Sequence, residues 1–266
     1  MIVTLLTDFG TRDYFVGAMK GALLSVNPEA LIVDITHEVA PHDVEEAAFT
    51  LLAAFETFPE GTVHVAVVDP GVGSTRRAIV VESEAQLFVG PDNGIFGHVY
   101  ERLARFRVFH AVEERCFRES ASTTFHGRDV FAPVAGALSL GTHPGELGPE
   151  VTDYVRLPFA APFQRDASTM VATVIHVDRF GNCVTNVTPH DLGSETFERG
   201  VSLVVAGREI KTIRRFFADD AGAPGEPFAV WGSAGLLEIA VFQDSAARAL
   251  GLKRGSEVEV LFGRAG

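Results

Sequence analysis

The first 140 or so residues alternate between β-strand and α-helix patterns, and this alternation limits the possible folds more than any other feature. Apolar runs rich in Val and Ile predict strands at 2–6, 31–35, 63–69, 78–83 and 86–90. Apolar residues at helical spacing predict helices at 13–26, 43–58, 95–104 and 130–140. A strand–helix–strand–helix–strand order predicts a mainly parallel sheet flanked by helices.

The ends of the first two predicted helices carry recognisable signals. Asp13 is the expected N-cap of helix 13–26, and the Asn-Pro pair at 27–28 ends that helix. Helix 43–58 has acidic residues in its first turn, which favours a helix N-terminus, and Pro-Glu-Gly at 59–61 follows its last turn.

The composition changes near residues 144–162, where Pro and Gly are frequent and no helical period is present, so we expect a linker there. Beyond it, short β patterns are separated by Gly-rich turns; they lie at 169–178, 200–207, 208–213, 236–242 and 256–262. They predict a smaller, mostly antiparallel, barrel-like β domain. We therefore expect an α/β protein with an N-terminal α/β domain, 1–158, and a C-terminal β domain, 159–266.

Composition and charge narrow the possible partners. With 47% hydrophobic and 21% charged residues, the chain has the composition of a globular protein. Its net charge of −13 disfavours nucleic acid and anionic membranes as partners. Two distant cysteines, Cys116 and Cys183, form neither a disulfide framework nor a zinc pattern. Residues 1–10 lack the basic leader of a signal peptide, and no apolar run is long enough to cross a bilayer, so we expect a cytoplasmic protein.

Polar residues follow each of the first three predicted strands. Thr7 and Asp8 end the first strand, the segment 34–37 with its Asp and His ends the second, and Asp69 ends the third. In parallel α/β sheets, ligands bind beyond the carboxyl ends of the strands. These residues are therefore candidates for a binding or catalytic site.

Three more polar clusters contain glycine, which allows the backbone to approach a ligand closely: GPDNG (90–94), TFHGRDVFAP (124–133) and DRFGNCVTN (178–186). Each candidate also has a structural interpretation: Asp8 and Asp178 as turn formers, Asp92 as a turn former or N-cap, His126 as a hydrogen-bonded structural histidine, and Asp129 as a helix N-cap.

The segment VVDPGVGSTRR (67–77) looks like a strand that enters a phosphate-binding loop, but its spacing excludes the standard phosphate motifs. Gly71 and Gly73 are too close together for the P-loop pattern, and no Lys follows. The dinucleotide fingerprint needs a third glycine where Arg76 stands. A metal site has weak support, because acids and His are present without HxH, HExxH or CxxC spacing.

Taken in order, the motifs resemble those of one family. They are TDFG (7–10), DYFVGAMKG (13–21), VVDPGVG (67–73), GPDNG, FHGRDVFAP (125–133) and DRFGNCVTN, followed by RFFADDAG (215–222) and GSAGLLEIAVFQDSAA (232–247). This ordered set is similar to that of the S-adenosyl-L-methionine hydroxide adenosyltransferases, relatives of the fluorinating and chlorinating enzymes that use the same substrate. The resemblance covers both predicted domains.

The resemblance implies a fold, an assembly and an activity. The family has an α/β N-terminal domain and a barrel-like C-terminal domain, and it assembles as a homotrimer. Each site lies between the N-terminal domain of one subunit and the C-terminal domain of the next. The implied reaction is hydrolysis of S-adenosyl-L-methionine to adenosine and L-methionine, without a metal or redox cofactor.

The resemblance also implies residue roles. The catalytic Asp, Arg and His of the hydroxide-forming members match Asp69, Arg76 and His126, whereas the fluorinating enzymes have Tyr at the first and last of these positions. The match therefore places this chain in the water-using branch. An aromatic lid of the halide-using relatives matches His42.

Substrate binding is implied for residues at both ends of the substrate. Asp8 matches the residue that holds the ribose hydroxyls, and Asp178 and Asn182 match those that hold the amino and carboxylate groups of the methionine part. Phe180 matches an apolar neighbour of the methionine end, and Phe217 and the segment 242–246 match the adenine side. The remaining implied contacts are Phe125 and Ser233. Composition alone would assign these phenylalanines to the core.

The residue types suit this chemistry. The leaving group is a neutral thioether, so the enzyme must supply an oriented, partly deprotonated water. Arg76 can stabilise a hydroxide-like nucleophile, Asp69 can anchor Arg76, and His126 can accept or relay the proton. Which group is the formal base stays open.

Two other functions stay possible from the residues. The first is a binding protein for S-adenosylmethionine or adenosine. The second is a metal-dependent phosphohydrolase that uses Asp8, Asp69, Asp92 and His126.

Overall fold

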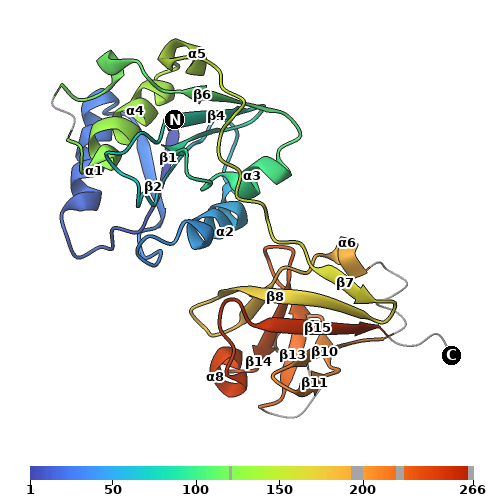
Figure 1. Ribbon diagram of the computed structural model, residues 1–266. Helices are drawn as coiled ribbons and strands as arrows, with labels where there is room; N and C mark the ends of the chain where they lie inside the picture. The colour runs from blue at the N-terminus through green and yellow to red at the C-terminus, as the bar shows by residue number, and fades with distance from the viewer. Residues whose placement is uncertain (120–121, 193–199, 220–224, 263–266) are drawn as a thin grey trace. The chain divides into compact units, whose positions relative to one another are not determined.

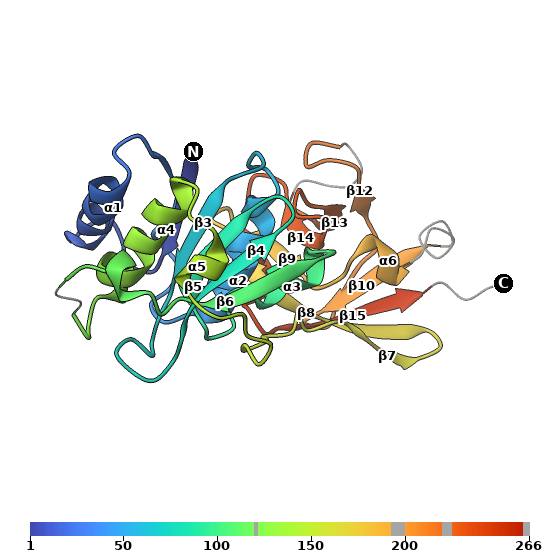
Figure 2. The ribbon, with the colours of Figure 1, turned by 90° about the horizontal axis from the view of Figure 1, so that it is seen from above.

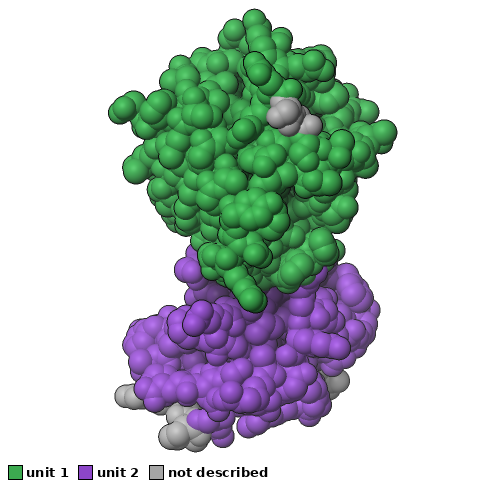
Figure 3. All heavy atoms as spheres, turned by 90° about the vertical axis from the view of Figure 1, so that its left-hand side faces the viewer, with its two compact units in different colours: residues 1–158 green, residues 159–266 purple. Residues whose placement is uncertain are grey.

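The computed structural model describes residues 1–119, 122–192, 200–219 and 225–262. The last three residues of the RFFADDAG motif lie outside these ranges. The chain divides into two compact units, Met1–Pro158 and Phe159–Gly266, which are coloured separately in Figure 3. Within the described residues, no helix combines the length and the apolar character that a bilayer crossing needs.

Unit 1 contains a six-stranded sheet and its flanking helices. Its strands are β1 (Ile2–Thr7), β2 (Leu31–Thr36), β3 (Val63–Val67), β4 (Ala78–Ser83), β5 (Leu87–Pro91) and β6 (Phe106–His110). Its helices are α1 (Phe15–Val26), α2 (Val44–Phe55), α3 (Gly97–Arg102), α4 (Ala132–Ser139) and α5 (Pro144–Leu147), with a 3-10 turn at Glu114–Cys116 and a π-helical turn at Gly127–Phe131. The strand order is β2-β1-β3-β5-β4-β6.

The sheet of unit 1 is parallel at one side and antiparallel at the other. β2, β1, β3 and β5 pair in parallel, and β4 pairs antiparallel with both β5 and β6. Figure 1 shows α1 and α4 on one face of this sheet and α2 and α3 on the other. Because helices cover both faces, every residue of β3 is buried, and all of them except His64 are apolar.

Several predictions for unit 1 need correction. The N-cap of α1 is Tyr14 rather than Asp13, and it makes no side-chain capping bond. The helix predicted at 130–140 begins with the π-helical turn, and the predicted linker contains α5, which starts with Pro144 at its first position. β6 was not predicted, because its sequence FRVFH mixes polar residues into a short edge strand.

Unit 2 contains a sheet of nine strands among the described residues. They are β7 (Phe163–Asp166), β8 (Thr169–Val177), β9 (Cys183–Thr185), β10 (Val201–Val205), β11 (Arg208–Ile210), β12 (Ile213–Arg214), β13 (Pro227–Trp231), β14 (Leu237–Val241) and β15 (Glu257–Phe262). Two short helices accompany them, α6 (Pro189–Leu192) and α8 (Ala246–Leu250). The order is β11-β10-β15-β8-β9-β14-β13-β12, with β7 beside β8.

The sheet of unit 2 curls into a half-barrel around its own apolar core. β8 takes part in both halves: its first part pairs with β15 and its last part with β9, with a register shift between Val174 and His176. Such an irregularity bends the strand. Figure 2 shows β10 beside β15 at one end of the curl. The predicted mixed α/β fold with two sheets is thus confirmed.

Candidate active site

A cavity of about 290 Å³ opens in unit 1 at the carboxyl ends of β1 and β3. Its polar lining residues are Asp8, His42, Asp69, Thr124 and His126. The sheet brings Asp8 and Asp69 together, because β1 and β3 are hydrogen-bonded neighbours and both end at this edge.

Asp69 and His126 line this cavity, and Arg76 joins them in one hydrogen-bonded chain. Arg76 Nε donates to Asp69 Oδ1 at 2.9 Å, and Arg76 Nη2 forms a second bond with Asp69 Oδ2. The same Nη2 lies 2.6 Å from His126 Nδ1. The Asp69 and Arg76 side chains are 6% and 10% exposed, so bulk water screens this ion pair weakly.

Gly73 of VVDPGVG allows the loops that carry this chain of bonds to touch. Gly73 has φ +78°, and a Cβ there would lie 2.4 Å from the carbonyl oxygen of Thr123. Loop 69–76 therefore packs directly on the backbone that leads to His126. A Cβ at Gly71 would lie 3.5 Å from Arg76 Cγ and 3.8 Å from Asp69 Oδ1. These are ordinary contact distances, so it is Gly73 that the packing of the two loops requires.

The contact between Arg76 and His126 fixes the histidine proton. A guanidinium has donors and no acceptor, so Nδ1 of His126 accepts the hydrogen bond and Nε2 carries the ring proton. Burial, and then the charge of Arg76, lower the pKa of His126 below its ordinary value. His126 is therefore neutral near pH 7.

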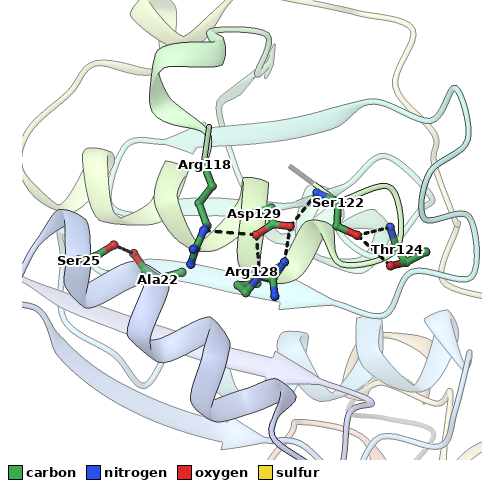
Figure 4. Close-up of polar contacts among 7 residues, drawn as sticks. All are labelled: Ala22, Ser25, Arg118, Ser122, Thr124, Arg128 and Asp129. Atoms are coloured by element: carbon green, nitrogen blue, oxygen red, sulfur yellow. Dashed lines mark hydrogen bonds and ion pairs between the residues drawn. The ribbon is translucent and has the colours of Figure 1, made fainter. Parts of the chain in front are cut away.

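A buried carboxylate holds the His126 loop in place (Figure 4). Asp129 is fully buried within the π-helical turn, and both its oxygens accept bonds from Arg128, at 2.6 and 2.8 Å. The backbone N–H of Ser122 donates to Asp129 Oδ2 at 2.8 Å, and Arg118 Nε lies 3.6 Å from Oδ1. Burial raises the pKa of Asp129, but the bonds from Arg128 and Ser122 outweigh it and hold that pKa below its ordinary value.

Asp129 therefore does not cap a helix that starts at Val130, as one interpretation of the sequence held. Its hydrogen bonds connect Ser122, which precedes His126, to the π-helical turn that follows His126. A π-helical turn adds a residue to the helix, and such turns are frequent at functional sites.

Asp8 lies at the end of β1 and is held by the loop opposite. Its Oδ2 accepts a bond from the backbone N–H of His42 at 2.8 Å, and His42 has φ +69°. Beneath it, Thr7 Oγ1 is 2.9 Å from His37 Nδ1, and His37 Nε2 is 3.2 Å from Asp34 Oδ1. The strand-end residues of β2 thus support the strand end of β1 and do not line the cavity.

Three aromatic rings form one wall of the cavity. Phe9, Phe15 and Phe125 lie with their ring centroids 5.2 to 5.9 Å apart. Gly127 fits against this group, since a Cβ there would lie 3.2 Å from Phe9 Cζ. Phe9 and Phe15 were not singled out from the sequence, where they are indistinguishable from core residues.

The GPDNG motif does not contribute to this cavity. Asp92 is buried and accepts bonds from Arg77 Nε at 2.8 Å and from the backbone N–H of Val155 at 2.8 Å. Arg77 also binds Asp153. Asp92 therefore anchors the segment that leaves unit 1, instead of capping α3, whose N-cap is Phe96.

The set of residues considered for a metal-dependent phosphohydrolase is consequently split. Asp8, Asp69 and His126 line one cavity, whereas Asp92 binds elsewhere. Within the described ranges, no group of three or more His, Cys, Asp or Glu side chains has the spacing to hold a metal ion.

Unit 2 has a cavity of its own, of about 780 Å³, lined by the DRFGN loop and by residues 241–248. Asp178 Oδ1 accepts bonds from the backbone N–H groups of Phe180 and Asn182, and its Oδ2 accepts one from Asn182 Nδ2. Gly181 has φ +84°, and a Cβ there would lie 2.0 Å from Ser245 Oγ. The two loops therefore pack directly on each other.

Aromatic side chains in this second cavity are unusually exposed. Phe180 is 77% exposed, Phe217 is 42% exposed and Phe242 is 41% exposed, and all three line the cavity. The structure thus contradicts the assignment of Phe180 and Phe217 to the core. Ser233 is exposed in the turn between β13 and β14 and is not among the lining residues.

Comparison with known proteins identifies the class that this fold and these two cavities define. Profiles of the SAM hydroxide adenosyltransferase N-terminal and C-terminal domains match residues 3–148 and 172–259. The chain belongs to the SAM hydroxide adenosyltransferase family.

Individual relatives match over nearly their whole length. The chain is 39% identical to an (R)-S-adenosyl-L-methionine hydrolase of Thermus thermophilus, over 97% of this chain and 99% of that protein. It is similar to the crystal structure of an uncharacterised conserved protein from Thermotoga maritima, with a TM-score of 0.90 and 36% identity, over 98% of this chain and 100% of that one. More distantly, it is 27% identical to a fluorinase of Actinoplanes sp., over 97% of each.

Proposed function

We propose that this protein hydrolyses S-adenosyl-L-methionine to adenosine and L-methionine. The observation that carries the proposal is the bonded set Asp69–Arg76–His126, whose Asp69 and His126 line one cavity with Asp8. Membership of the family and similarity to proteins named (R)-S-adenosyl-L-methionine hydrolase support the same activity.

The reaction is a substitution at the ribose C5′. The oxygen of a water molecule forms a bond to C5′ while the C5′–S bond breaks, and the electron pair of that bond goes to sulfur. Methionine then leaves as a neutral thioether, so no general acid is needed. For the same reason the proposed reaction includes no metal or redox cofactor, and we expect activity to persist in a chelator.

The hydrogen-bond directions favour Asp69 as the acceptor of the water proton. Its two oxygens offer about four lone pairs, of which Arg76 uses two. His126 has its Nδ1 lone pair turned to Arg76, and its Nε2 carries a proton, so it can donate to the water oxygen. Asp8, with one oxygen bonded to His42 N, keeps lone pairs for the two ribose hydroxyls.

The residues of unit 2 complete the proposed site from a neighbouring subunit. In this arrangement, Asp178 and Asn182 hold the methionine end, and Phe217 lies on the adenine side, together with the segment 242–246. The exposed rings of the unit 2 cavity support the idea that another surface covers it. The proposal includes a homotrimer in the cytoplasm, and the two free cysteines suit a reducing compartment.

Co-expression of two inactive variants tests the shared site. We would combine Asp69→Asn subunits with Asp178→Ala subunits. If each site combines two subunits, about a quarter of the sites are intact in randomly mixed trimers, and activity returns. If the mixture stays as inactive as either variant alone, each site is built within one subunit.

Product analysis tests the activity itself. Purified protein is incubated with S-adenosylmethionine in ¹⁸O-labelled water, and the products are separated by chromatography and weighed by mass spectrometry. We expect adenosine with the label at its 5′ oxygen. Binding of the substrate with no adenosine formed would refute the proposal and leave a binding protein.

Substitutions then test the residues. We expect kcat to fall by about 10²-fold or more in each of Asp69→Ala, Arg76→Ala and His126→Ala. Each substitution removes a contact to the attacking water or a bond that positions a residue contacting it. Arg105→Ala is the matched control, since Arg105 is an exposed arginine of the same unit. Unchanged turnover in Arg76→Ala would remove this set from the mechanism.

A further inference from the structure

Asp8 and Phe9 line the unit 1 cavity, and both lie past the end of the strand that carries them. The ladder between β1 and β3 ends with Thr7, and the ladder between β1 and β2 ends one residue earlier. Backbone beyond the last paired residue is held only by the other hydrogen bonds that it makes. The position of these two cavity residues therefore depends on bonds outside the sheet.

His37, the residue that follows β2, bonds to both ends of the turn 7–10. Its ring Nδ1 lies 2.9 Å from Thr7 Oγ1, and its carbonyl oxygen accepts a bond from the backbone N–H of Gly10 at 2.7 Å. Within the turn, Thr7 Oγ1 also accepts a bond from the N–H of Phe9 at 3.2 Å. Thr7 is fully buried and His37 is 4% exposed, so water competes weakly for these bonds. His37 thus holds the turn at its first and last residue.

The hydrogen-bond directions run one way from the turn to the surface. Thr7 Oγ1 accepts from Phe9 N–H, and its own hydroxyl proton is then available for His37 Nδ1. This leaves the ring proton on His37 Nε2, which faces Asp34 Oδ1 at 3.2 Å, a charge contact without the alignment of a full hydrogen bond. The other oxygen of Asp34 lies 2.6 Å from Lys20 Nζ. A surface ion pair is thereby joined to the turn through two buried side chains.

The side chain of Asp8 is held by a separate bond. Its Oδ2 accepts from the backbone N–H of His42, which fixes the direction of the carboxylate. His37 and Thr7 fix the backbone from which that carboxylate projects. Because a hydrogen bond weakens steeply with distance and angle, a small shift of this backbone would misalign every further bond that Asp8 forms.

We propose that Thr7 and His37 are positioning residues for recognition of the substrate's ribose by Asp8. This inference rests on the proposed function, because that function places the ribose hydroxyls at Asp8. Neither Thr7 nor His37 lines the cavity, so both act through the turn that they hold. Their bonds affect how tightly the ribose is bound, whereas attack on C5′ depends on the bonded set of Asp69.

The variant Thr7→Val, with Thr4→Val as a matched control, tests the proposal. Thr4 is on the same strand and is also fully buried, and its Oγ1 lies 2.7 Å from His64 Nδ1. Thr4→Val therefore removes the same kind of Thr–His bond at a place away from the cavity. Thr7→Ser keeps the hydroxyl and is the conservative variant.

In Thr7→Val we expect KM for S-adenosylmethionine to rise about 10-fold with kcat little changed, as for weakened bonds to a charged group in the ground state. Thr7→Ser and Thr4→Val should keep the KM of wild type. Equal losses of melting temperature in Thr7→Val and Thr4→Val, with KM unchanged in both, would mean a purely structural role and overturn the proposal.

Calorimetry with adenosine and 2′-deoxyadenosine measures ribose recognition without turnover. Wild type should bind adenosine at least about 10-fold more tightly, as for a hydrogen bond to a carboxylate. In Thr7→Val this ratio of affinities should fall toward one, and in Thr4→Val it should stay as in wild type. An unchanged ratio in Thr7→Val would refute the proposal.

Asp34→Ala perturbs the same series of bonds from its exposed end, where a folding defect is not expected. It should lower the ratio by about 3-fold, as for one ordinary hydrogen bond. If Thr7→Val does not fold, an unchanged ratio in Asp34→Ala refutes the proposal in its place. If the ratio falls as expected but wild type makes no adenosine from S-adenosylmethionine, the proposed activity fails and this inference stands.

Discussion

The variant Gly73→Ala tests whether direct packing of two loops sets the catalytic geometry. Alanine at φ +78° costs about 1–2 kcal/mol in backbone conformation. In addition, its Cβ would lie 2.4 Å from Thr123 O, whereas real contacts are not shorter than 3.0 Å. The loops must therefore separate by at least about 0.6 Å. Because a 1 Å misplacement can cost about 10²-fold in rate, we expect kcat to fall by about 10- to 100-fold.

Gly61→Ala is the matched control. Gly61 has φ +80°, and no atom lies within 4 Å of its built Cβ, so it shares the backbone cost without the clash. Both variants should lose a few degrees of melting temperature, at about 2–4 °C per kcal/mol for a unit of this size. Adenosine formation is measured by chromatography and the melting temperature by circular dichroism. Together they separate the loss of turnover from the loss of stability. Equal kcat in the two variants would refute the reasoning that loop contact positions His126 against Arg76.

Two further predictions concern buried polar groups of unit 1. Asp129→Asn removes the charge that accepts the Arg128 and Ser122 hydrogen bonds and should lower the free energy of unfolding in urea by about 1.5–3 kcal/mol. The exposed pair Glu84–Arg105 offers the control Glu84→Gln, with an effect below about 1 kcal/mol; similar losses in both would contradict the role of Asp129. His64 is fully buried, and burial lowers its pKa to about 4. The unfolded chain then binds the extra proton between pH 6.5 and 4, so stability is full above pH 6.5 and falls by about 3 kcal/mol toward pH 4. Urea unfolding across this range should show a flatter dependence in His64→Gln, and an unchanged slope would exclude His64 as its source.

The sequence predicted the sheet edge and its acids because both follow from short-range patterns. An apolar run that ends in a polar residue marks a strand end, and alternation with helices makes neighbouring ends meet. Asp8 and Asp69 were singled out in this way, and they line one cavity. Asp92 has a similar local signature, an acid at the end of a strand and two residues before a glycine, but it binds Arg77 and Val155. Only tertiary contacts distinguish these two kinds of acid.

Other features lie beyond what residue periodicity can express. The π-helical turn at 127–131 has the same apolar spacing as an α-helix over so short a length, and only its hydrogen bonds reveal it. Glu238 lies in the strand predicted at 236–242, which the structure contains as β14. A single charged residue between apolar neighbours predicts an exposed position of an antiparallel sheet. The burial of Glu238 depends on Gly232 and Val184, which the sequence does not place near it.

In the proposed mechanism, the bonded set Asp69–Arg76–His126 also discriminates between nucleophiles by the direction of the hydrogen bonds that it offers. The carboxylate of Asp69, paired with Arg76, offers lone pairs to whatever occupies the cavity. Water can donate to it, whereas a halide ion has no proton to give and meets a like charge at close range. If Asp69 accepts the proton as proposed, the same carboxylate also repels halide ions, and a neutral side chain at this position would both admit halide and remove the base.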